Sequence, residues 1–444
     1  MMHSTSFSSD VLLTMGTNLF MAMLILITGP LSARILGPEG RGELAAIQLW
    51  APFLSIPIML GLPAAVVYYA ARERENAGIY TLSSMVLNCA AALLILPLAY
   101  FLLPLLLRAQ NPATIVAAQR YLLLFIPIQM LSILPASTLR GMNELFWWNF
   151  FRILPNVVWL LTLLLGLFLG HTYATWFAFV YLGFLFLHAI PRLLVLRRRI
   201  TGPFRPRAAA ARPLLKFGLP SLTGSIFSNL NLRLDQMLMA ALIAPELLGL
   251  YAVAVAWSNA VGPVVQAIGQ VLYPRVAAQT TARRQAETMV QGAHLGVIVA
   301  VGVTIPVMLL TPLAIPLLFG PAFVASVPVS LVLVAAGLFN AIKIVLQEGA
   351  LGLGSPKAVL AGEAVGLLFT ALALALLLRP LGIMGAAIAS LLGYLATTGV
   401  LLLQVSRLIR IHALTLLVPT RDDFALLRRK AHHLWRSLAA VPSS

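Results

Sequence analysis

Long apolar segments recur along nearly the whole of this chain. Residues 79–107, 290–319 and 382–405 hold almost only apolar and small side chains. A helix needs about 20 such residues to cross the hydrocarbon core of a bilayer, and in lipid every backbone polar group must find its partner within the protein. The segments lack the alternation of a membrane β-strand. We therefore expect an all-α, polytopic membrane protein.

The composition sets the number of crossings. Of the 444 residues, 60% are hydrophobic and 10% are charged, whereas about a quarter of the residues of a soluble domain are charged. A chain this apolar has material for about a dozen spans. The hydropathy pattern predicts twelve helices, at 11–33, 44–70, 79–107, 118–138, 149–170, 173–195, 217–243, 248–273, 290–319, 325–347, 358–378 and 382–405.

The basic residues predict how the chain is divided and oriented. The segment at 197–216 is rich in Arg, Pro and Ala and separates a six-helix lobe at 1–196 from a second at 217–405. Lys and Arg number 23 on one predicted side of the membrane and five on the other. Because positive loops stay in the cytoplasm, we expect both termini and the linker at 197–216 to be cytoplasmic. The tail at 406–444 is predicted to form a basic amphipathic helix on the membrane surface.

The net charge of +17 does not indicate nucleic acid, because the basic residues lie between apolar runs and not on a soluble domain. There is no P-loop and no nucleophile motif. His, Cys and carboxylate residues are not paired at metal spacing. We therefore expect no enzymatic activity, no cofactor and no metal site.

One short sequence is repeated. "ILGPEGRGELAAIQLW" at 35–50 resembles "LIAPELLGLYAVAVAW" at 242–257 at a constant offset of 207 residues. The matched positions are Pro38 with Pro245, Glu39 with Glu246, Gly42 with Gly249, and Trp50 with Trp257. Six predicted helices separate the copies, so both enter the membrane in the same direction, as in a parallel repeat. Two such lobes are typical of an alternating-access transporter with its substrate site between them.

"ARILGPEGRGELAA" at 33–46, "RLDQ" at 233–236, "GLYAVA" at 249–254 and "ALGLGSPKAVLAGEAVGL" at 350–367 carry a resemblance. In these residues the chain resembles the Wzx-type polysaccharide flippases of the multidrug/oligosaccharidyl-lipid/polysaccharide (MOP) exporter superfamily. The resemblance implies two lobes of six helices in the inner membrane. It also implies transport of a lipid-linked oligosaccharide or polysaccharide precursor from the cytoplasmic to the periplasmic leaflet.

Polar residues within a span are functional candidates, because an ionisable side chain in hydrocarbon is unfavourable. The segment 229–236 contains five, "N-L-N-L-R-L-D-Q". Asn229 and Arg233 share one helix face, while Asp235 points nearly opposite. We expect Arg233 to meet a substrate phosphate in the central cavity, with Asn229 beside it. The alternative is a structural ion pair of Arg233 with Asp235 or another helix.

Further candidates lie in the second half and at the outer side. Lys343 is predicted either to pair with Glu363 or to give the substrate a second cation. Gln266 could line the groove near Arg233, and Arg34 could contact substrate from an outer loop or be a solvated surface charge. Arg152, beside two tryptophans, indicates an interfacial anchor, with phosphate capture as the alternative.

Three functions remain possible from the sequence. The lipid-linked glycan flippase fits the internal cations, with the bilayer, the glycan lipid, and glycosyltransferases and a polymerase of its pathway as partners. A cation-coupled drug exporter would use internal carboxylates, and Asp235 or Glu363 could bind H⁺ or Na⁺ in either case. A membrane glycan polymerase or ligase would need a large outer loop, which the chain lacks.

Overall fold

The computed structural model describes residues 7–259, 262–277 and 279–420. Within these ranges the chain forms helices and no strands, which confirms the expected all-α membrane fold. The predicted amphipathic helix of the tail falls mostly at 421–444, outside the described residues. The α-helices are α1 (Phe7–Ile58), α2 (Leu62–Arg72), α3 (Ala77–Leu106), α4 (Pro112–Gly141), α5 (Leu145–Leu169), α6 (Ala174–Arg199), α7 (Ala211–Leu242), α8 (Pro245–Ser258), α9 (Gly262–Ala277), α10 (Ala282–Ala314), α11 (Val327–Gly352) and α12 (Pro356–Ile409).

Each of the twelve predicted segments is largely helical, but the breaks differ from the prediction. The first two run together as α1, which turns at Gly37, and the last two run together as α12, which turns at Gly382. Both glycines have positive φ, 66° and 56°, a conformation that glycine adopts without strain. The predicted second helix is also interrupted near Gly61, and the eighth is divided into α8 and α9. Eight helical segments of the described chain are long and apolar enough to span a membrane.

The described chain separates into two compact units, and each is described by itself. Unit 1 comprises the residues up to Ala256 with Pro312–Val329 and Leu378–Ala386. Unit 2 comprises Trp257–Thr311, Ser330–Leu377 and the residues from Ala387 onward. Unit 1 thus holds the first seven helices, most of α8, and two short segments around the α10–α11 connection and the α12 turn.

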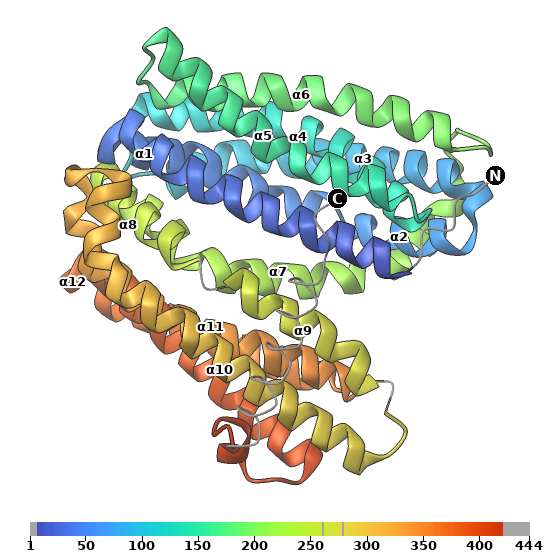
Figure 1. The fold of residues 1–444 in the computed structure, drawn as a ribbon. Coiled ribbons are helices and arrows are strands. Elements are labelled where there is room, and N and C mark those ends of the chain that lie inside the picture. Colours follow the sequence, from blue (N-terminus) through green and yellow to red (C-terminus); the bar gives the residue numbers. More distant parts are fainter. Residues whose placement is uncertain (1–6, 260–261, 278, 421–444) are drawn as a thin grey trace, which may run out of the picture. The chain divides into compact units, whose positions relative to one another are not determined.

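Helix α4 is the centre of unit 1. It packs against α1, α2, α3, α5 and α6, and Figure 1 shows α5 and α6 running lengthwise beside it. Helix α7 joins this bundle through contacts with α1, α2 and α3. Gln110, just before α4, donates from its side-chain amide to the carbonyls of Ala240 and Ile243, at 2.9 and 3.1 Å, and so caps the C-terminal end of α7.

The two copies of the repeated sequence pack against each other within unit 1. A Cβ placed on Gly42 would overlap the carbonyl oxygen of Pro245, and a Cβ placed on Gly249 would overlap the carbonyl oxygen of Pro38. The contact is reciprocal: each glycine lies against the proline of the other copy. Because glycine has no side chain, the two backbones approach more closely here than any other residue would permit.

Unit 2 has its own core. Apolar side chains of α9, α10, α11 and α12 are buried together, with Val265, Met289, Val345 and Leu401 nearly inaccessible. A short 3₁₀-helix, η5 (Ala413–Leu416), closes this core after α12. His294 of α10 is buried and donates from Nε2 to the carbonyl of Thr415, which holds that segment in place.

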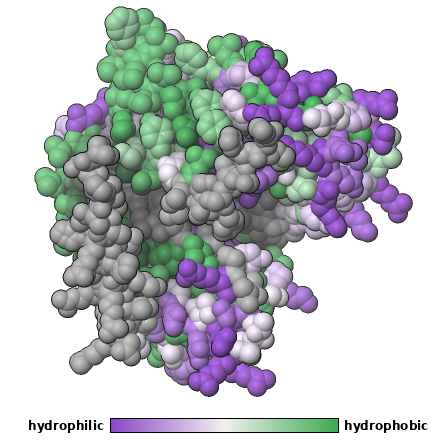
Figure 2. Space-filling view, turned by 45° about the vertical axis from the view of Figure 1, so that its right-hand side comes forward, coloured by the Kyte–Doolittle hydropathy of each residue, from purple (hydrophilic) through white to green (hydrophobic). Residues whose placement is uncertain are grey.

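The outer surface of the helices is itself apolar. On α3 the side chains of Leu93, Leu94 and Phe101 are 78%, 79% and 77% exposed. Figure 2 shows broad apolar areas on the visible face, with the hydrophilic side chains gathered in separate areas. An exposed apolar surface of this extent is typical of helices that face lipid, which agrees with a multi-pass membrane protein.

The reciprocal glycine contact leads to a prediction. Gly42→Ala and Gly249→Ala should each lower the free energy of unfolding by about 1–3 kcal/mol, because the new methyl group meets a backbone carbonyl that cannot rotate away. The midpoint of thermal unfolding of the purified protein in detergent measures this. Gly183→Ala is the matched control, since a Cβ there has no neighbour within 4 Å and alanine favours helix. Equal midpoints for all three variants would contradict the prediction.

Candidate functional site

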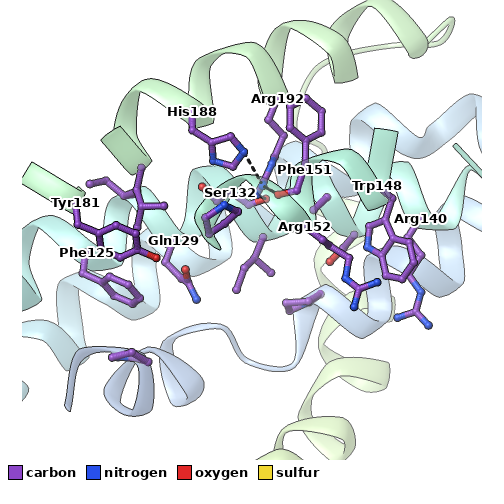
Figure 3. A pocket seen from close by; sticks show the side chains of 18 of the residues that line it. Phe125, Gln129, Ser132, Arg140, Trp148, Phe151, Arg152, Tyr181, His188 and Arg192 are labelled. Carbon is purple, nitrogen blue, oxygen red and sulfur yellow. Dashed lines mark hydrogen bonds between the residues drawn. The ribbon is translucent and has the colours of Figure 1, made fainter. Parts of the chain in front are cut away.

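Unit 1 contains a cavity of about 820 Å³. Its described wall is formed by side chains of α1, α2, α4, α5 and α6 and by Arg233 of α7 (Figure 3). The described lining residues include four arginines, and none of them is an aspartate or glutamate. The arginines are Arg140, Arg152, Arg192 and Arg233. A cavity with several cations and no acid attracts anions.

Arg140 and Arg152 lie together beside Trp148 (Figure 3). Their guanidinium carbons are 5.0 and 4.5 Å from the centre of the Trp148 ring, within the range of cation–π attraction. Arg152 also donates to the amide oxygens of Asn149 and Asn18, at 3.2 and 3.0 Å. These partners are neutral, so they fix the Arg152 guanidinium without cancelling its charge.

Arg192 is the most deeply buried of the four, at 5% exposure. It donates to the backbone carbonyls of Ser132 and Phe151, at 2.6 and 2.7 Å, and to Nε2 of His188 at 3.1 Å. A buried charge needs such hydrogen bonds, and these come from neutral groups on α4, α5 and α6. Its Nε and the Nδ1 of His188 are buried without a protein partner. The positive charge therefore has no acid to balance it in the described wall of the cavity.

Among the described side chains of α7, Arg233 is the one that lines the cavity, and it is exposed. Asp235, two residues along, is buried and accepts hydrogen bonds from the Tyr251 hydroxyl and from the backbone N–H of Gln236. Asn229 is half-buried on α7 and does not belong to the described lining of this cavity. Of the polar residues predicted on this helix, the structure therefore brings Arg233 to the cavity wall.

Another part of the cavity wall is neutral. Tyr121, Phe125 and Gln129 of α4, Tyr181 of α6 and Gln48 of α1 line it. Figure 3 shows Phe125, Gln129 and Tyr181 on one side of the view and Arg140, Arg152 and Trp148 on the other. The cavity thus changes from aromatic and amide side chains to arginines along its length.

Lys343 and Glu363 form an ion pair within unit 2, with 3.1 Å between Nζ and Oε1. Both are buried, at 4% and 7% exposure. Gln347 donates to the same carboxylate oxygen, and the Lys343 Nζ lies 5.5 Å from the centre of the Tyr394 ring. Of the two alternatives that the sequence left open for Lys343, the structure shows the pairing.

Arg34 is engaged with the backbone of unit 1. It donates to the carbonyls of Leu317 and Leu318, the second at 2.7 Å. These carbonyls belong to a π-helical turn, η3 (Ile315–Phe319), that follows α10. Arg34 therefore caps a helix end. Gln266 lies on α9 in unit 2 with its side chain exposed.

Two arginines of the cavity are not recognisable as site residues in the sequence. The charge pattern counts Arg140 and Arg192 among the loop charges that orient the chain, and it favours an anchoring role for Arg152. The structure places all three within helices and on the cavity wall. A signal is present in their spacing, because Arg192 follows His188 by four residues and Arg152 follows Asn149 by three, which puts each pair on one helix face.

The fold is similar to solved structures of transporters. A lipid II flippase MurJ in an inward closed conformation matches with a TM-score of 0.73 and 15% identity, over 89% of this chain and 87% of that one. A multidrug resistance MATE family transporter of the MOP superfamily, inward-facing, matches with a TM-score of 0.69 and 13% identity, over 89% and 98%. The MATE multidrug transporter DinF-BH matches with a TM-score of 0.63 and 17% identity, over 91% and 96%.

The sequence itself matches one protein family. No curated protein is similar enough in sequence to be matched to the chain. The family described as "Polysaccharide biosynthesis protein" matches residues 7–280, which is more than half of the chain and includes every described residue of the cavity wall. The chain therefore belongs to the polysaccharide biosynthesis protein family and has the fold of MOP superfamily transporters.

Proposed function

We propose that this protein translocates a lipid-linked oligosaccharide or polysaccharide precursor, carried on a polyprenyl pyrophosphate, from the cytoplasmic to the periplasmic leaflet. The observation that carries the proposal is the cavity of unit 1, whose described wall has four arginines and no carboxylate. The polysaccharide family and the flippase-like fold support it.

The chemistry of such a substrate fits the cavity. Its polyprenyl tail stays in the hydrocarbon, while its pyrophosphate requires cations and hydrogen-bond donors along the path. Arginine presents a planar fork of donors that matches phosphate oxygens. Arg152 and Arg192 are held by neutral partners and keep their charge available. A site for cationic drugs would require acids in the same wall, so the cavity argues against a drug exporter.

Transport by alternating access requires that the ends of two lobes separate. We propose lobes at 1–196 and 217–405, joined by the linker at 197–216. The reciprocal contact of Gly42 and Gly249 ties the predicted outer ends of the two lobes together. Each glycine meets backbone atoms of the other copy, so these glycine contacts can part without a change of rotamer.

The surroundings of the protein follow from the same proposal. It lies in the inner membrane with both termini in the cytoplasm, and it transports its substrate without catalysing a reaction on it. Glycosyltransferases supply its substrate and a polymerase consumes the product. Arg34 and Lys343 are engaged with protein groups here, so their proposed contact with substrate requires these partners to be released. Asn229 and Gln266 remain proposed contacts.

Arg152→Gln tests the arginine cavity. Loss of one charge-assisted hydrogen bond corresponds to about 1.5–3 kcal/mol, so we expect the affinity for a short-chain polyprenyl pyrophosphate to fall at least about tenfold. Binding by the purified protein in detergent measures this, with unchanged thermal unfolding as the check on folding. The same affinity as the wild type would contradict the proposal.

The control for that measurement is Arg120→Gln. Arg120 is an exposed arginine of α4, the helix that also carries Arg140, and it does not belong to the described cavity wall. The substitution removes the same charge from the same protein. We expect Arg120→Gln to leave the affinity for the polyprenyl pyrophosphate unchanged. An equal loss of affinity in Arg120→Gln and Arg152→Gln would show that only the net charge of the protein matters.

Coupling of transport to H⁺ or Na⁺ is proposed at Asp235 and Glu363, and the buried ion pair provides a test. Glu363→Gln leaves the Lys343 ammonium buried without its carboxylate, so the free energy of unfolding should fall by about 3–5 kcal/mol. The double variant Lys343→Leu with Glu363→Leu should recover most of it, because an apolar pair can replace a buried ion pair. Thermal unfolding measures both.

The Lys343→Leu, Glu363→Leu double variant then separates the structural role of Glu363 in the ion pair from its proposed role in binding the coupling ion. In proteoliposomes that carry a pH or Na⁺ gradient, transport by the double variant should no longer respond to the gradient if Glu363 binds the coupling ion. An undiminished response would remove Glu363 from that role and leave Asp235, for which Asp235→Asn is the corresponding variant.

A further inference from the structure

We propose that the neutral end of the unit 1 cavity is a glycan subsite, in which Gln129 and Tyr181 bind the sugar residues while the arginine end binds the phosphates. The inference rests on the proposed function and deepens it. It assigns separate side chains to the sugars and to the phosphates of one headgroup. The headgroup would then lie with its sugars toward Gln129 and Tyr181 and its phosphates toward the arginines.

Helix α4 shows how far apart the neutral end and the arginine end of the cavity are. Gln129 and Arg140 are both on α4 and both line the cavity. They are eleven residues apart, or about 16 Å at the rise of an α-helix. Figure 3 shows the same polarity, with Tyr181 beside Phe125 and Gln129 at one end and Trp148 beside Arg140 and Arg152 at the other. The cavity is therefore long enough for the two ends to contact different parts of one ligand.

The polar groups of the neutral end are available for a ligand. The Gln129 amide and the Tyr181 hydroxyl line the cavity from half-buried side chains. Within the described chain, neither makes a hydrogen bond to another protein group. A polar group in a partly buried wall is stabilised when a ligand supplies its partner. Gln129 offers two donors and an acceptor, and Tyr181 offers one of each, which suits the neighbouring hydroxyls of a sugar.

The aromatic rings at this end are held in place. Phe125 stacks on Tyr121 with ring centres 5.6 Å apart, and Tyr181 packs edge-on against Trp159 at 5.3 Å. The Tyr121 hydroxyl faces the Gln48 side chain, which orders that part of the wall. Fixed amphipathic rings provide an apolar surface beside polar tips. A sugar ring, with C–H groups on its faces and hydroxyls on its edge, matches this arrangement.

Other occupants fit the neutral end less well. Gln48, Tyr121, Phe125, Gln129 and Tyr181 carry no charge, so a phosphate is better placed at the arginines. A polyprenyl tail would leave the amide and hydroxyl groups without partners. An uncharged group with several hydroxyls satisfies both the aromatic and the polar side chains.

Binding measurements on the purified full chain in detergent test this subsite. The probes are a short-chain polyprenyl pyrophosphate without sugar and the same lipid carrying either a hexose or an N-acetylhexosamine. We expect the wild type to bind at least one glycosylated probe more tightly than the bare lipid. Gln129→Leu and Tyr181→Phe should each reduce that advantage about tenfold and leave the affinity for the bare lipid unchanged.

Tyr173→Phe is the matched control, because Tyr173 precedes the same helix as Tyr181 but is 72% exposed and outside the described cavity wall. It should retain the full advantage of the glycosylated probe. Equal wild-type affinity for all three probes would overturn the glycan subsite while leaving the proposed function intact, as would equal weakening of all probes by the two variants. Failure of the wild type to bind any probe would overturn the proposed function itself.

Discussion

The reciprocal packing of Gly42 on Pro245 and of Gly249 on Pro38 explains why the chain contains nearly the same sequence twice. Each copy supplies a glycine that lets the backbone of the other copy approach, so neither copy can form the contact alone. The contact holds α8 against α1, and α7 leads directly into α8. Arg233 therefore lies at the cavity wall on α7, a helix whose C-terminal end is fixed by Gln110 and by this glycine contact.

The cavity combines two demands that normally conflict. A cation in a membrane protein is stabilised most simply by an acid, but an acid would cancel the charge that a phosphate requires. Arg192 avoids this by donating to two backbone carbonyls and a histidine, and Arg152 by donating to two asparagines. Neutral acceptors satisfy the hydrogen-bond donors and leave the net charge in place.

Much of this fold could be predicted from the sequence, because apolar length and the spacing of turns decide where membrane helices form. The helix breaks were harder, since the turns at Gly37 and Gly382 arise from single positive-φ glycines inside continuous helical patterns. The site was predicted only in part. Arg233 stood out within an apolar run, whereas Arg140 and Arg192 lie near helix ends, where a loop charge and a cavity charge have the same appearance. Whether such an arginine faces solvent or the cavity is decided by how α4, α5 and α6 pack together. This packing cannot be read from a single sequence.

The two groups of cations, the arginines of the unit 1 cavity and Lys343 of unit 2, consequently have different roles. Lys343 is neutralised by Glu363 at 3.1 Å, so this pair presents a dipole whose field falls off quickly. The arginines of unit 1 present net charge, and at an effective dielectric constant of about 20 a unit charge roughly 4 Å away still contributes about 4 kcal/mol. Under the proposed function, the pyrophosphate of the substrate is therefore attracted to the arginines of unit 1, whereas the neutralised Lys343 offers it little net charge.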